Sequence, residues 1–170
     1  MKVRYKPNVT VACIIHAPNI HVPNDDKFLM VEEWIEGEQR FNQPAGHLEA
    51  NESLISACER EVLEETGLSL TPSGLVGIYQ FSASAELSFL RFTFCVQVDE
   101  MQDTIPQDKD ISACHWLTLE QIEAKATQLR SPLVLDCLRD YLHHFQNRNT
   151  YSLELLNSTR LTIAPSGNAC

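Results

Sequence analysis

Three glutamates, Glu61, Glu64 and Glu65, stand three and four residues apart in the chain. A helix turns by about 100° per residue, so it would hold these acids in a sector about 100° wide, beside the apolar positions Cys58 and Val62. Like charges at these spacings repel by roughly 0.2 to 0.5 kcal/mol per pair, and acids near a helix C-terminus face the negative end of its dipole. Because the arrangement disfavours folding, we expect it to serve a function.

A hard divalent cation would remove this repulsion. Mg²⁺ takes oxygen ligands and usually binds through one or two carboxylates together with the phosphates of a substrate. Between Gly46 and Gly67 there are six acids and one base, a net charge of −5 out of −10 for the whole chain. The sequence therefore predicts a metal site on this helix, and the alternative is a solvated acidic face without a function.

The residues around the acids follow a longer pattern over 46–68, GHLEANESLISACEREVLEETGL. This segment resembles the Nudix box, G-x5-E-x7-R-E-U-x-E-E-x-G-U with U apolar, and matches it at every specified position. A chance match is on the order of 10⁻⁶ at average residue usage. Two further segments, 41–49 and 129–134, resemble a phosphatase branch of the family, and the similarity extends over about residues 5–156.

The resemblance implies hydrolysis of a diphosphate linked to a variable group, with Mg²⁺ or Mn²⁺ as cofactor and water attacking one phosphorus. Carried over by position, Glu64 and Glu65 are metal ligands, and Glu61 is a ligand or the base that activates the water. Which glutamate is the base stays open. Arg60 is expected to orient a carboxylate through a charge-assisted hydrogen bond.

The residues before this helix have supporting roles in the same interpretation. Glu52 positions Arg60 and the start of the helix, Gly46 permits a tight loop, and the backbone carbonyl of Ala45 reaches the metal. Many family members have Gly-Gly where this chain has Ala45-Gly46. An acidic ligand from a distant loop is represented by Asp108 or Asp110, for which an ordinary polar loop is the alternative.

Substrate contacts are less specified by the sequence. Arg91 is expected on the non-core face of its strand, where it could touch a phosphate. His47 lies in the loop that enters the site, and we interpret it as a loop residue rather than a catalyst. The aromatic residues that could stack on a planar ring, each with a place in the core as the alternative, are Trp34, Phe41, Phe89 and Trp116.

The expected function is a metal-dependent hydrolase that releases orthophosphate from terminal pyrophosphates: nucleoside di- and triphosphates, thiamine pyrophosphate and hydroxymethylpyrimidine pyrophosphate. One alternative is a housecleaning pyrophosphatase with the same box, which releases pyrophosphate from nucleoside triphosphates. The alternative of another class is a non-catalytic sensor of nucleotide sugars. Such a sensor can lose the acids of the box, whereas this chain keeps all of them.

The composition agrees with a folded enzyme, since 44% of the 170 residues are apolar and 21% are charged. The net charge of −10 disfavours nucleic acid and anionic membranes as partners, and the apolar run 9–15 is far shorter than a membrane helix. The six cysteines lie 19 or more residues apart without a C-x-x-C pair, which favours reduced thiols and a cytoplasmic protein. A small pyrophosphate substrate is the expected partner; a monomer is expected, and a dimer is left open.

The order of elements predicts an α/β fold, an α/β/α sandwich of the Nudix type with a mixed sheet. The helix carrying the acids is expected over 52–66, with Asn51 as its N-cap and Gly67 at its end. The domain is expected over 1–156, followed by a flexible tail over 157–170. Strands are predicted at 9–15, 27–33, briefly after 34–37, at 75–81, 89–98 and 113–117, and further helices at 119–126 and from Ser131-Pro132 to 146.

Overall fold

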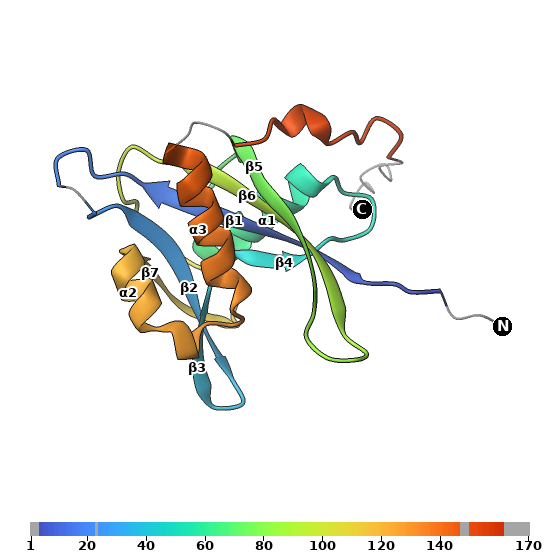
Figure 1. Ribbon diagram of the computed structural model, residues 1–170, viewed down its shortest axis with the longest axis horizontal. Helices are drawn as coiled ribbons and strands as arrows, with labels where there is room; N and C mark the ends of the chain where they lie inside the picture. The colour runs from blue at the N-terminus through green and yellow to red at the C-terminus, as the bar shows by residue number, and fades with distance from the viewer. Residues whose placement is uncertain (1–3, 23, 147–149, 162–170) are drawn as a thin grey trace, which may run out of the picture.

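The structure, a computed structural model, describes residues 4–22, 24–146 and 150–161 (Figure 1). The strands are β1 (Asn8–Ala17), β2 (Lys27–Ile35), β3 (Glu38–Asn42), β4 (Ala45–His47), β5 (Gly74–Ser82), β6 (Ser88–Gln97) and β7 (Ile111–Leu117). The helices are α1 (Leu54–Thr66), α2 (Leu119–Ala124) and α3 (Leu133–Gln146), with short 3-10 turns at Ala126–Gln128 and Leu153–Leu155. The predicted tail falls largely on residues 162–170, which lie outside the described ranges.

The strands form one mixed sheet in the order β3-β2-β1-β6-β5, in which β1 and β6 run parallel and the other pairs are antiparallel. β1 pairs with β2 only at its end, where His16 lies opposite Phe28. Its earlier residues Thr10, Val11 and Ala12 pair with β4 instead. The sheet therefore splits between β2 and β4, and this split lies next to the acidic helix.

Helices cover both faces of the sheet, with α3 in front and α1 behind in Figure 1. On the α1 side, Cys58 and Val62 pack into a core with Phe94 of β6. On the α3 side, Leu138 and Tyr141 pack into a second core that also takes in α2. The predicted α/β/α sandwich with a mixed sheet is confirmed.

The start of α1 corrects one prediction. Ser53, not Asn51, is the N-cap, and its side chain accepts a hydrogen bond from the N–H of Ser56. Asn51 adopts the left-handed backbone conformation with φ of 67°, so Glu52 precedes the helix rather than lying in its first turn. The end is as predicted, because Gly67 has φ of 77° and its N–H bonds to the carbonyl of Leu63.

Two features of the sheet also differ from expectation. β4 has three residues, too few for a hydrophobic alternation to reveal it. The face of β6 that carries Arg91 and Thr93 was expected away from the core, yet these side chains are 6% and 0% exposed. The reason is α3, which covers this face and therefore buries the second side of β6 as well.

The helix α2 ends at Ala124, two residues before its expected end.

In the ranges that the structure describes, no helix is both long and apolar enough to cross a membrane.

Candidate active site

α1 places its three acids at the split in the sheet. Glu61 and Glu65 are buried, with exposures of 9% and 8%, and they face β4. Glu64 lies further out, with its side chain 45% exposed. The 100° sector of acids predicted from the helical period thus spans the boundary between core and solvent, as a site open to substrate requires.

Glu61 lies directly against the backbone of β4. A Cβ atom built on Gly46 would be 2.1 Å from Glu61 Oε1, closer than any real contact. Gly46 lies within β4 and pairs with Val11, so the tight loop expected at this glycine is wrong. Its missing side chain instead provides the space that Glu61 occupies.

Glu65 is bound to the neighbouring residue of the same strand. Its Oε2 atom accepts a hydrogen bond of 2.8 Å from the N–H of Ala45. Burial, together with the charges of Glu61, Glu33 and Asp108, raises the pKa of Glu65 to about 8, although the hydrogen bond from Ala45 lowers it. Four carboxyl groups therefore act on one another at this point of the sheet.

Arg60 joins the carboxylates of α1 to the segment before it. Its Nε and Nη2 atoms donate to both oxygens of Glu52 at 3.0 and 2.8 Å, and Nη2 also donates to the carbonyl of His47. Nη1 donates to Glu61 at 2.7 Å and to Glu64 at 3.1 Å. The hydrogen bonds from Arg60 hold the pKa of Glu52 below its usual range. One guanidinium thus fixes the positions of three carboxylates.

Glu33 of β2 belongs to the cluster, and no sequence pattern singled it out. A bulge between Glu32 and Glu33, in the pairing with β7, re-aims this part of the strand. Burial raises the pKa of Glu33, the charge of Arg130 at 3.4 Å lowers it, and Asp110 and Asp108 raise it. The apolar run 28–31 marks a strand, but nothing in the sequence tells which of the two glutamates that follow it joins the site.

The loop before β7 is tied to α1 by its backbone. The N–H groups of Gln107 and Asp108 both donate to the carbonyl of Glu64, at 2.8 Å each. The Asp108 side chain in turn accepts a hydrogen bond from the N–H of Asp110. The distant loop therefore does approach the acidic helix, and both aspartates act electrostatically on Glu33.

The cluster fits a hard divalent cation by its chemistry. All its candidate donors are oxygens, they carry excess negative charge, and burial raises the pKa values of Glu61 and Glu65. Within the described residues, no three His, Cys, Asp or Glu side chains already stand in metal-ligand geometry. The reason is visible in the contacts, because Arg60 holds Glu61 and Glu64 while Ala45 holds Glu65. Rotation of these side chains would turn their oxygens to a shared ion.

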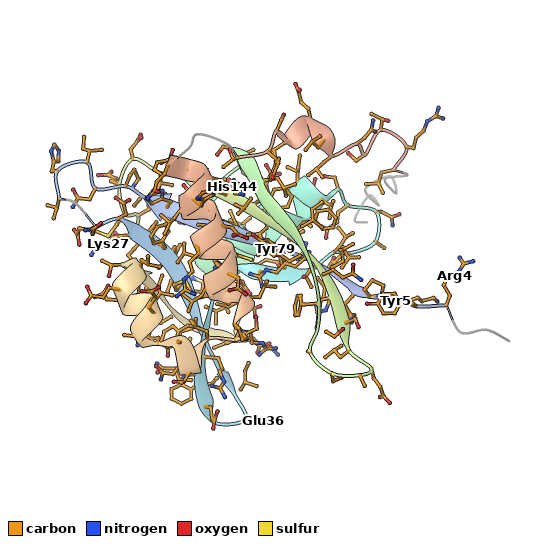
Figure 2. All side chains as sticks on the ribbon, viewed as in Figure 1. Arg4, Tyr5, Lys27, Glu36, Tyr79 and His144 are labelled. Carbon is orange, nitrogen blue, oxygen red and sulfur yellow. The ribbon has the colours of Figure 1, made fainter. Side chains whose placement is uncertain are left out.

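A polar cavity of about 610 Å³ adjoins the cluster through Glu33. Trp34 is 60% exposed on its wall, and the cations Lys109 and Arg130 line it together with Asp110. Glu36, which also lines the cavity, lies at the tip of the hairpin between β2 and β3 (Figure 2). An exposed indole and two cations beside a carboxylate cluster suit a planar group that carries phosphate.

The other aromatic candidates lie elsewhere. Phe41 is 2% exposed, with the Lys125 Nζ atom 4.5 Å from its ring centroid, so its expected role in stacking on a substrate ring is wrong. Trp116 packs against the α1-side core and donates to the carbonyl of Gln102. Phe89 stacks on Phe81 with ring centroids 5.0 Å apart. Of the four, Trp34 alone lines the cavity beside the acids.

The comparisons with known proteins agree with this geometry. A sequence model of the NUDIX domain matches residues 6–137. Two curated relatives named Phosphatase NudJ, from Shigella boydii serotype 4 and Escherichia coli K12, are 44% and 43% identical over 152 residues, 89% of this chain and 92% of each relative. A solved NUDIX hydrolase from Nitrosomonas europaea is 43% identical, with a TM-score of 0.75 over 89% of this chain and 97% of that one.

A more distant likeness shows the fold alone. The NUDIX domain of Shewanella oneidensis NrtR, solved with ADP ribose, is 15% identical, with a TM-score of 0.66 over 82% of this chain and 90% of that one.

The fold, the acids gathered at the split in its sheet and the matches to known proteins together define a hydrolase of phosphoric anhydrides. The chain belongs to the Nudix family of such enzymes. Nudix hydrolases generally use a divalent metal ion.

Proposed function

We propose that this Nudix hydrolase uses Mg²⁺ or Mn²⁺ to release orthophosphate from terminal pyrophosphates. The observation that carries the proposal is the convergence of Glu61, Glu64 and Glu65 with Glu33 and the Asp108 loop, next to a polar cavity. The name of the relatives, Phosphatase NudJ, supports orthophosphate rather than pyrophosphate as the product.

The carboxylates of α1, with the carbonyl of Ala45, would hold the metal. A bound divalent ion there supplies charge neutralisation for the phosphates and lowers the pKa of an attacking water. Among the described contacts Glu61 uses Oε1 for Arg60 and Glu65 uses Oε2 for Ala45. The second carboxylate oxygen of Glu61 and of Glu65 remains available to bind an ion or to accept a proton from the water. Arg60 holds Glu61 and Glu64 in place through its hydrogen bonds.

The chemical step is a displacement at phosphorus. The water oxygen forms a bond to the terminal phosphorus while the bridging P–O bond breaks, and the water proton passes to a carboxylate oxygen of Glu61 or Glu65. The rest of the substrate extends into the cavity, where Trp34 would stack on its ring and Lys109 and Arg130 would meet its remaining phosphate charge.

Two further parts of the proposal concern the state of the protein. The cysteines that the structure describes are all free thiols, which supports a reducing, cytoplasmic environment. We propose a monomer as the active form. We propose residues 1–156 as the catalytic domain.

The test is a screen of phosphorylated metabolites with Mg²⁺, in which orthophosphate and pyrophosphate are measured separately. We expect orthophosphate from nucleoside di- and triphosphates, thiamine pyrophosphate and hydroxymethylpyrimidine pyrophosphate, and none in EDTA. In ¹⁸O-labelled water the label should enter the orthophosphate. Pyrophosphate and a nucleoside monophosphate as the sole first products would instead favour the housecleaning pyrophosphatase, and tight binding of nucleotide sugars without turnover would favour a sensor.

A further inference from the structure

Arg91 of β6 carries a buried charge without a direct ion pair, on which the carboxyl group of Glu65 acts only from a distance. The residue is 6% exposed, and its Nη2 atom donates to Gln43 Oε1 at 2.8 Å. Its Nε atom has no hydrogen-bond partner, and no carboxylate in the described ranges forms an ion pair with it. Burial of an unpaired ion costs several kcal/mol in general. An anion from outside the chain would remove that cost.

The groups that surround Arg91 on two sides are neutral. Tyr79 of β5 lies beside α3 (Figure 2), where its hydroxyl donates to Asp140 at 2.8 Å. Cys137 of α3 has its sulfur 3.3 Å from the Thr93 hydroxyl. Burial raises the pKa of both Tyr79 and Cys137, so neither is ionised at neutral pH. Tyr79 and Cys137 therefore lie beside the guanidinium without supplying a negative charge.

On its third side, Arg91 lies within electrostatic range of Glu65 of the active site. Thr10 of β1 pairs with Arg91 on one side and with His47 of β4 on the other, so the two residues are two strand spacings apart, about 10 Å. Gln43 precedes Ala45 by two residues, and Ala45 binds Glu65. The Gln43 amide also donates to the carbonyl of Val134 at 2.8 Å, which orients its oxygen toward Arg91. The contacts from Arg91 to Gln43, and from Ala45 two residues later to Glu65, thus connect Arg91 with the carboxylate cluster.

We propose that Arg91, held by Gln43, is a specificity-determining residue that binds the terminal phosphate of the substrate. This inference rests on the proposed function. Because Arg91 is 6% exposed and residues of β5 and α3 lie beside its guanidinium, we expect a phosphate bound there to be the end of the substrate, without a substituent beyond it. A pyrophosphate with one free end fits, with its organic part in the cavity at Trp34, whereas a pyrophosphate esterified at both ends does not.

The first test compares two classes of substrate in Arg91→Met, Arg91→Lys and the control Arg139→Met, which removes an exposed cation of α3. Loss of charged hydrogen bonds is expected to lower kcat/KM for a nucleoside triphosphate by about 10- to 100-fold in Arg91→Met, mainly through KM, with partial recovery in Arg91→Lys. Turnover of ADP-ribose, which has no free phosphate end, should be the same in Arg91→Met as in the wild type. Arg139→Met should behave as wild type.

The second test measures binding without turnover. Orthophosphate should raise the Tm of the wild type and of Arg139→Met but not of Arg91→Met, and this holds even if no substrate in the screen is hydrolysed. Without ligand, Arg91→Met removes an unpaired charge but also leaves the buried Gln43 Oε1 atom without its donor, so its Tm should stay close to that of the wild type. Two results would show that Arg91 is structural and would overturn the inference. One is a lower Tm of Arg91→Met together with equal losses of kcat/KM for both substrate classes. The other is a Tm of Arg91→Met that rises with orthophosphate as much as that of the wild type. A wild type without activity in the screen would overturn the proposed function instead.

Discussion

Replacing Glu65 by Gln tests the interpretation of the acidic helix through stability rather than through activity. Glu65→Gln keeps the shape of the side chain and its acceptor for the N–H of Ala45, and removes only the ionisable group. Among the three acids of the sector it is the most informative, because Arg60 already compensates Glu61 and Glu64 by direct hydrogen bonds.

The magnitude follows from the pKa of Glu65, which is about 8 in the folded protein against 4.5 for an ordinary glutamate. Between these values the folded state holds a proton that the unfolded state has released, so the stability of the metal-free wild type falls as pH rises from about 4.5 to about 8. At pH 7 this amounts to about 3 kcal/mol. Glu65→Gln lacks this loss and is expected to melt about 6 to 12 °C higher in EDTA.

The assay is a set of thermal melts at pH 5, 7 and 8, in EDTA and in excess Mg²⁺. The gain from Glu65→Gln should be small at pH 5 and largest at pH 8. Mg²⁺ at a hundred times its Kd stabilises the wild type by about 2.7 kcal/mol, and the variant should respond much less. Glu100→Gln, at an exposed position after β6, is the matched control and should behave as wild type. A variant less stable than wild type in EDTA, together with a wild type indifferent to Mg²⁺, would refute the metal-site interpretation.

Three further predictions concern single side chains. Gly46→Ala places a Cβ where Glu61 lies and should lower kcat by about 100-fold, and an unchanged kcat in steady-state kinetics would contradict the close approach of the two residues. Trp34→Ala should raise KM by about 10-fold with little change in kcat, since stacking on a base contributes about 1 to 3 kcal/mol, and a loss in kcat alone would exclude stacking. Burial lowers the pKa of His16 despite the facing Asp26, so urea melts should show wild-type stability falling as pH drops below about 6.5, and His16→Gln should flatten this dependence if His16 causes it.

The acids of α1 could be predicted from the sequence because helical periodicity is a local property. Once residues 54–66 are helical, the spacing of Glu61, Glu64 and Glu65 alone places them on one side, and Gly67 ends the helix by its left-handed conformation. The alternation of apolar residues over 89–98 located β6 in the same way, and the β-branched run 9–15 between two turns located β1. The N-cap was mistaken because Asn51 and Ser53 are both good caps, and the backbone of the loop decides between them.

The tertiary structure decided which distant residues join the site. Glu33 reaches the cluster through a bulge in β2, and Gly46 matters because α1 packs against β4. Arg91 and Gln43 are 48 positions apart and meet because β6 and β4 both pair with β1. Such contacts depend on strand order, and on α3 covering a face that an alternating pattern assigns to solvent. A single sequence records the period of each element but not the partner that each element packs against, so it determined the chemistry of α1 and left its surroundings to the fold.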